Sequence, residues 1–162
     1  DMTLALLEKG RKRIAYFAAR MDERTRLKMQ GYRQAVENAG QDPISLQTEE
    51  ASSFTLGATL LDQMLEHYPD VDGIVCTNDD LAIGALYECQ RRGIRVPEQI
   101  AIAGFHGHDI SQVIIPKLAT VITPREEIGR VAAEQLIERL KGNESWEKTI
   151  DLGYKIEYGE SI

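Results

Sequence analysis

The chain has 162 residues, of which 43% are hydrophobic and 28% are charged, proportions that are ordinary for one soluble domain with one hydrophobic core. The formal net charge of −7 argues against a nucleic-acid-binding face within these residues, because phosphates are contacted mainly by clustered lysines and arginines. No apolar run approaches the ~18 residues that a membrane span requires, and no signal peptide is visible. The first residue is Asp1 rather than Met, so we expect a piece of a longer protein, and a missing leader is uninformative.

The first half of the chain alternates apolar helical patterns with short apolar strands. Met29, Tyr32 and Val36 recur at helical spacing, and Gly40 and Pro43 are the usual signals for the end of a helix. In chain order, the sequence predicts a helix over 3–9, a strand over 14–18, a helix over 24–39, a strand over 44–47 and a helix around 60–65 that ends before Pro69.

The central segment predicts a complete strand, helix and strand unit. Residues 73–76 form a short run rich in β-branched side chains, which is typical of a strand buried on both faces of a parallel sheet. Asn78 follows as a candidate helix cap, while Asp79 and Asp80 suit the positive end of the helix dipole. The helix is predicted to end at Gly93, and the return strand covers 100–104.

The last third predicts another strand at 118–122 and a long helix at 124–141. Thr123 to Glu126 combine a capping box with proline at the first helical position. The helix has an apolar stripe, made of Ile128, Val131, Ala132, Leu136 and Leu140. Short closing strands are predicted at 148–152 and 155–158. The alternation indicates an α/β fold with an open, mainly parallel sheet and helices on both faces.

Two cysteines fall at predicted core positions, Cys76 in a strand and Cys89 on the buried face of a helix. This pattern is typical of small core residues in a reducing compartment, so we expect no disulfide and a cytoplasmic protein. Motifs for a nucleophile elbow, a dinucleotide, a P-loop or a metal are missing. We therefore expect no catalysis and no cofactor.

Polar residues at the predicted strand ends are the candidates for a ligand site. In open α/β sheets, ligands bind beyond the carboxyl ends of the strands, which selects Asn78, Asp79, His106 and His108 by position. The alternatives are that Asn78 only caps its helix, that Asp79 only organises the loop, and that His106 is satisfied by backbone. The two histidines with Asp109 fall short of a recognisable zinc motif, so no metal is expected.

Arg24 and Lys28 lie four residues apart at the start of a predicted helix. Like charges at this spacing cost a few tenths of a kcal/mol, and the helix dipole also disfavours cations there. An anionic ligand would offset both effects. The alternative is a solvated pair that is balanced by Asp22 and Glu23.

Four segments resemble the effector-binding domain of the lac-repressor and gal-repressor family of bacterial transcription regulators, which is related in fold to periplasmic sugar-binding proteins. They are RKRIAYFAARMDERTRLKMQGYRQAVENAG at 11–40, TNDDLAIGAL at 77–86, RGIRVPEQIAIAGF at 92–105 and LATVITPREEIGRVAAEQL at 118–136. Within the family, DERT followed by Lys28, and FHGHD at 105–109, are most similar to the branch of gluconate-utilisation repressors.

This resemblance implies a periplasmic-binding-protein-like domain of type I with two lobes and a sugar between them. Residues 1–122 and 148–162 then belong mainly to the second lobe, and the helix at 124–141 belongs to the first. A helix-turn-helix headpiece and the start of the first lobe are expected before Asp1. Operator DNA would be read by that headpiece and not by this chain, and a homodimer is implied.

The resemblance also implies ligand contacts at Arg24, Lys28 and His106, which join Asn78, Asp79 and His108, selected by their position, as the candidate ligand-binding residues. His106 stands where many members of the family have an aspartate, and a histidine can donate a bond and carry charge near its ordinary pKa. Together with the two cations it indicates a sugar acid such as gluconate. If protonated His106 pairs with the carboxylate, binding should weaken as the pH rises from about 5.5 to 8, whereas a flat profile would leave His106 a neutral hydrogen-bonding role. Alternatives are a periplasmic-type sugar-binding protein of a transporter or receptor, and an α/β enzyme.

Overall fold

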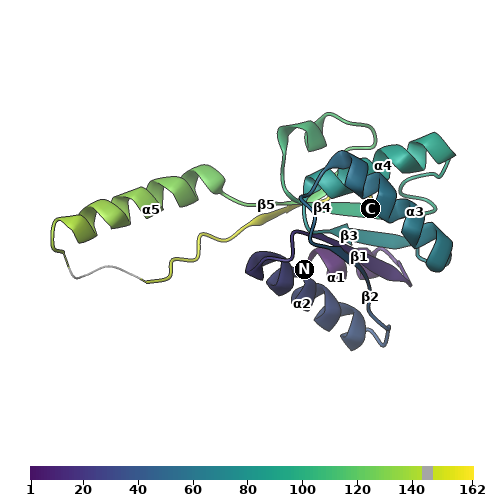
Figure 1. The fold of residues 1–162 in the computed structure, drawn as a ribbon, viewed down its shortest axis with the longest axis horizontal. Coiled ribbons are helices and arrows are strands. Elements are labelled where there is room, and N and C mark those ends of the chain that lie inside the picture. The colour runs from purple at the N-terminus through teal and green to yellow at the C-terminus, as the bar shows by residue number, and fades with distance from the viewer. Residues whose placement is uncertain (144–147) are drawn as a thin grey trace.

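The computed structural model describes residues 1–143 and 148–162 and has one open sheet. The strands stand in the order β2-β1-β3-β4-β5-β6, and only β6 is antiparallel to its neighbour (Figure 1). Their bounds are β1 Ile14–Ala19, β2 Ile44–Thr48, β3 Gly73–Cys76, β4 Ala101–His106, β5 Ala119–Ile122 and β6 Lys155–Glu157. The open, mainly parallel sheet predicted from the sequence is confirmed.

Helices cover both faces of the sheet (Figure 1). Alternate side chains of β1 serve the two faces, because successive residues of a strand point in opposite directions. Ala15 and Phe17 join the core with helices α3 (Phe54–His67) and α4 (Asp79–Arg92), whereas Ile14 and Tyr16 join the core with α1 (Met2–Glu8) and α2 (Glu23–Asn38). All residues of β1 and β3 are buried, as expected for strands covered on both sides.

Helices α3 and α4 approach each other closely through two glycines. A Cβ atom at Gly57 would lie 2.2 Å from the carbonyl oxygen of Leu81, and one at Gly84 would lie 1.9 Å from that of Phe54. Only glycine fits where the two backbones meet at this distance. The contact fixes the first turn of α4 against the first turn of α3, at the edge of the sheet where the strands end.

Side-chain caps define where α2, α3 and α4 begin. Asn78 accepts a hydrogen bond from the backbone N–H of Leu81 at 3.2 Å, so the cap predicted from the sequence is confirmed. Asp22 caps α2 and Ser53 caps α3 in the same way. Gly93 ends α4 in the left-handed conformation, at a φ of 69°.

Helix α5 (Arg125–Leu140) stands away from the body on an extended connection (Figure 1). None of its residues is buried, and within the apolar stripe Leu136 is 58% exposed and Leu140 79%. The predicted capping box is wrong. Pro124 occupies the N-cap position itself, so Thr123 lies one residue too early and makes no cap bond.

One further local prediction, the strand at 148–152, is wrong. Residues 148–152 lie on the segment that returns from α5, outside the sheet, and only β6 pairs there, with Thr120 of β5 opposite Glu157. After β4, Asp109–Gln112 form a short 3-10 helix, η1.

Candidate functional site

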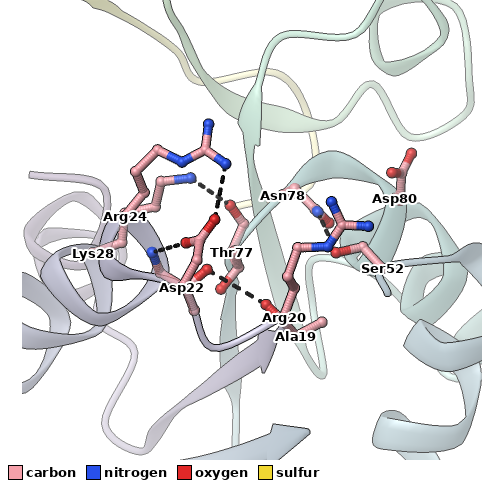
Figure 2. Close-up of a pocket in the computed structure, with 10 residues that line it drawn as sticks. Ala19, Arg20, Asp22, Arg24, Lys28, Ser52, Thr77, Asn78 and Asp80 are labelled. Atoms are coloured by element: carbon pink, nitrogen blue, oxygen red, sulfur yellow. Dashed lines mark hydrogen bonds and ion pairs between the residues drawn. The ribbon is translucent and has the colours of Figure 1, made fainter. Parts of the chain in front are cut away.

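A cavity of about 190 Å³ opens at the carboxyl ends of β1 and β3 (Figure 2). Three helices begin at its edge, since Asp22 caps α2, Asn78 caps α4, and Ser52 directly precedes the cap of α3. Helix N-termini carry partial positive charge, which favours an anion at this place. The lining residues are Ala19, Arg20, Asp22, Arg24, Thr25, Lys28, Ser52, Thr77, Asn78 and Asp80.

Arg24 lines the cavity with its charge already paired. Its guanidinium donates to Asp22 at 2.8 Å. This bond, together with one from the backbone N–H of Thr25, lowers the pKa of Asp22 to about 2, so the carboxylate stays ionised. The alternative that Asp22 balances the charge of Arg24 therefore agrees with the ion pair in the structure.

Lys28 reaches from α2 to the end of β3. Its Nζ donates to the carbonyl oxygen of Thr77 at 3.1 Å and lies 3.9 Å from the centroid of the Phe105 ring. Burial lowers the pKa of Lys28 to about 8, and the charge of Arg24 acts in the same direction. The ammonium group is thus charged at neutral pH but lies close to its titration range.

The side chain of Asn78 caps α4 and still has hydrogen-bonding groups that are not used. Its Oδ1 accepts from Leu81, and its Nδ2 donates to Ser52 Oγ at 2.6 Å (Figure 2). A primary amide has two donor hydrogens and two acceptor lone pairs, so one of each remains. Asn78 can cap α4 and hydrogen-bond a ligand hydroxyl at the same time.

Asp79 lies fully buried beneath the cavity and does not line it. Thr120 Oγ1 donates to one carboxylate oxygen at 2.6 Å, and the backbone N–H of His108 donates to the other at 2.6 Å. Gly104 leaves room for this carboxylate, since a Cβ there would lie 2.2 Å from Asp79 Oδ1. Asp79 therefore ties the start of α4 to β5 and to the segment after β4, which agrees with the loop-organising alternative.

The two histidines stand beside the cavity at the end of β4. Burial lowers the pKa of His106 to about 4, and the charges of Lys28 and His108 add to the effect. This lowered pKa favours the neutral role of His106 over the charged one, and a neutral imidazole donates one bond and accepts another. The ring of His108 stacks on that of His106 with the centroids 6.1 Å apart, and its Nδ1 lies 3.5 Å from Asp80 Oδ1.

The structure brings Arg24, Lys28 and Asn78 to one cavity and adds residues that the sequence reasoning missed. Arg20, Ser52 and Thr77 also line it. Arg20 had a usable signal, because it follows a predicted strand just as Asn78 does. Ser52 had none beyond its place in a polar loop. Among residues 1–143 and 148–162, no group of three or more His, Cys, Asp or Glu side chains is placed to hold a metal ion, and no helix is long and apolar enough to cross a membrane.

Comparison with known sequences gives a match over almost the whole chain. Residues 3–162 fit the periplasmic binding protein-like domain. The HTH-type transcriptional regulator GntR of Escherichia coli strain K12 is 50% identical over 162 residues, which are all of this chain and 49% of that protein. The HTH-type transcriptional regulator IdnR of the same strain is 44% identical, with the same coverage. The chain spans about half the length of these curated relatives.

Solved structures agree with the sequence matches. The transcription regulator GntR from Chromobacterium violaceum superposes with a TM-score of 0.96 at 40% identity, covering 99% of this chain and 60% of that one. A LacI-family regulator from Silicibacter pomeroyi gives a TM-score of 0.90 at 34% identity, over 99% of this chain and 49% of that one. A complex of the transcriptional regulator CelR with cellobiose gives 0.87 at 27% identity, over 98% and 49%.

Proposed function

The chain belongs to the periplasmic binding protein-like family, within the lac-repressor group, and from this premise we propose that it is the effector-sensing part of a bacterial DNA-binding repressor that responds to gluconate or a related sugar acid. The observation that supports this most is the cavity at the ends of β1 and β3, where cationic side chains and three helix N-termini meet. The relatives reported above are transcriptional regulators, which favours sensing over periplasmic transport or catalysis.

A polyhydroxy acid fits the chemistry of this cavity. Arg20, Arg24 and Lys28 contribute positive charge, against Asp22 and Asp80. Carboxylates form their strongest hydrogen bonds with such cations. Ser52, Thr77 and Asn78 offer neutral donors and acceptors of the kind that sugar hydroxyls need. The solved CelR relative is described as a cellobiose complex, so this fold holds a sugar in that protein.

In the proposed arrangement, residues 1–122 and 148–162 form most of the second lobe, and α5 belongs to the first. The unburied apolar stripe of α5 supports this assignment, because a helix with such a stripe normally packs it against another element. An effector between the lobes would change their relative orientation by binding one arrangement more tightly than the other, and DNA affinity would change with it. The net charge of −7 supports a DNA reader outside this chain.

We also propose that the protein is a cytoplasmic homodimer, without a cofactor. Ile110, Val113 and Ile115 are exposed on η1 and the segment after it, at 43%, 74% and 80%. The side chain of Gln90 donates to the carbonyl oxygen of Ile115, which holds this segment against α4 near the exposed Tyr87. An apolar patch of this kind is typical of a contact surface between subunits.

Calorimetry on the intact regulator tests the choice of effector. We expect gluconate to bind more tightly than glucose, and Lys28→Ala to weaken gluconate binding. Lys9→Ala serves as the matched control. It removes an exposed lysine that follows α1, before β1 begins, and it should not change gluconate binding. Equal or tighter binding of glucose by the parent protein would contradict the proposed function.

A further inference from the structure

Arg20 differs from the other two cations of the cavity in having no partner for its side chain. Arg24 is paired with Asp22, while Lys28 donates to Thr77 and lies over Phe105. Within the part of the chain that the structure describes, the guanidinium of Arg20 makes neither a hydrogen bond nor an ion pair. Its full charge and all of its donors are therefore available to a ligand in the cavity.

The backbone of Arg20 adopts an unusual conformation, which sets the direction in which its side chain leaves the backbone. Its φ is 49°, in the left-handed region that costs free energy for a residue with a Cβ, and its N–H donates to the carbonyl oxygen of Glu50 at 2.9 Å. Among the described residues, His106 at the end of β4 is the other non-glycine residue with a positive φ, at 112°. Conformations of this kind gather at ligand sites, where the surrounding structure maintains them.

The position of Arg20 places it apart from Arg24 and Lys28. Figure 2 shows its guanidinium beside Ser52 and Asn78, with Asp22 between it and the other two cations. The ionised carboxylate of Asp22, which is bonded to Arg24, would repel an anionic group that approached Arg24. The groups directly beside Arg20 are the neutral Ser52 and Asn78, and the second carboxylate of the lining, Asp80, has Nδ1 of His108 3.5 Å away. A planar guanidinium can also bind both oxygens of a carboxylate at once, which an ammonium cannot.

We propose that Arg20 binds the carboxylate of the effector and thereby selects an acid over a neutral sugar, while the hydroxylated part of the effector extends toward Lys28 and Thr77. This inference rests on the proposed function, because it assumes a sugar acid in this cavity. It assigns the selectivity to a residue outside the sequence-based set, and it gives Arg24 the lesser role of holding Asp22.

The test compares Arg20→Gln with Arg24→Gln in the intact regulator, by calorimetry with gluconate and with glucose. A charge-assisted bidentate contact is worth roughly ten- to a hundredfold in affinity, so Arg20→Gln should weaken gluconate binding by about that factor and leave glucose binding unchanged. Arg24→Gln should change gluconate binding by less than about threefold. Arg26→Gln, which removes an exposed cation from the same helix, controls for a general effect of charge.

Two additions keep the test decisive. Arg20→Asn removes the charge with a residue that tolerates the left-handed backbone, so it should behave like Arg20→Gln if folding is preserved. Arg20→Lys keeps the charge without the bidentate geometry and should lose affinity for gluconate only in part. Thermal unfolding of each variant verifies that the body is intact.

The outcomes separate this inference from the proposed function. If Arg20→Gln and Arg20→Asn bind gluconate like the parent while Lys28→Ala does not, Arg20 is not the carboxylate ligand and the proposed function stands. If these variants bind gluconate and glucose more weakly than the parent by the same factor, Arg20 does not provide selectivity, and the inference is overturned. A parent protein that prefers glucose would contradict the proposed function itself.

Discussion

Helices α4 and α5 have similar lengths, 14 and 16 residues, but opposite surroundings. Helix α4 has a side-chain cap, a left-handed glycine at its end and an interior made of buried residues from Asp79 to Cys89. Helix α5 has no side-chain cap bond and no buried residue, although its sequence has an apolar stripe. The comparison teaches that the helical pattern is local, whereas the partner that an apolar stripe packs against is decided by other parts of the molecule.

The same contrast extends to function. Contacts with distant segments hold the start of α4 in place at the cavity, such as the bonds from Asn78 to Ser52 and from Thr120 to Asp79. The ion pairs on α5 join residues only a turn apart, as when Arg130 contacts Glu127 and Glu134. Pairs of this local, exposed kind stabilise a helix weakly and position nothing beyond it.

Matched glycine substitutions should give the largest difference between the two helices. Gly84→Ala places a Cβ against the backbone of α3, and we expect it to lower the free energy of unfolding by about 3 kcal/mol. Gly129→Ala on α5 meets no atom within 4 Å and should raise helical stability by roughly 0.5–1 kcal/mol. Urea denaturation measures both. Equal effects would mean that α5 is packed as tightly as α4.

Two neighbouring aspartates of α4, Asp79 and Asp80, should differ in how much their substitution lowers the free energy of unfolding. Asp79→Ala leaves the hydroxyl of Thr120 and the N–H of His108 without their acceptor in a buried place, which should cost about 2 kcal/mol of stability. The control is Asp80→Ala, a partly exposed residue, with an expected change within about 0.5 kcal/mol. A fully tolerated Asp79→Ala would show that the buried network does not hold the loop.

The burial of Lys28 should appear in the pH dependence of effector binding. The charged form of Lys28, whose pKa is about 8, attracts an anionic effector and donates strongly to its hydroxyls, so affinity for gluconate should fall by up to about tenfold between pH 7 and pH 9. Since the pKa of His106 is about 4, its charge does not change between pH 5.5 and 7, and affinity should be constant there. Calorimetry across this range measures both parts. Lys28→Met should remove the fall at high pH, and a fall that persists would assign it to another group.

Leu136→Glu on α5 should have the smallest effect on the stability of the body. The side chain is 58% exposed, so the free energy of unfolding should change by less than about 0.5 kcal/mol. The bare stripe should nevertheless cause the 162-residue chain to associate, and light scattering should show less association for the variant. A monomer at all concentrations, together with a clear loss of stability, would indicate that the stripe packs on the body.

Most of the fold was predictable because its signals are local. The strand and helix spacing, the cap at Asn78 and the stop at Gly93 each depend on a few adjacent residues. The capping box at Thr123 shows the limit of such signals, since a shift of one residue leaves its hydroxyl outside the helix. The strand predicted at 148–152 shows another limit, because β-strands need a neighbour that the local pattern does not specify.

The site was predictable only in part. The strand-end rule selected Asn78, which lines the cavity, together with Asp79, His106 and His108, which do not. Arg24 and Lys28, which also line it, were selected by their charge spacing at the start of a helix. Arg20 follows a predicted strand and could have been selected by that rule, but nothing in the sequence marks its left-handed backbone. The lowered pKa of His106 was not predicted because it comes from burial and from cations on other elements. Charge states and backbone strain depend on tertiary contacts, which no local pattern contains.

Strands β5 and β6 are neighbours in the sheet and pair antiparallel, so the segment that contains α5 is an insertion between two adjacent strands. Ile122 lies opposite Lys155, so residues 123–154 leave and re-enter the body at one place. A two-residue turn could join these strands as a hairpin, and the cost of closing such a loop varies only slowly with its length. We expect a body with this short hairpin to keep its strand order and both hydrophobic clusters. It would then fold on its own and could be studied without the inserted helix.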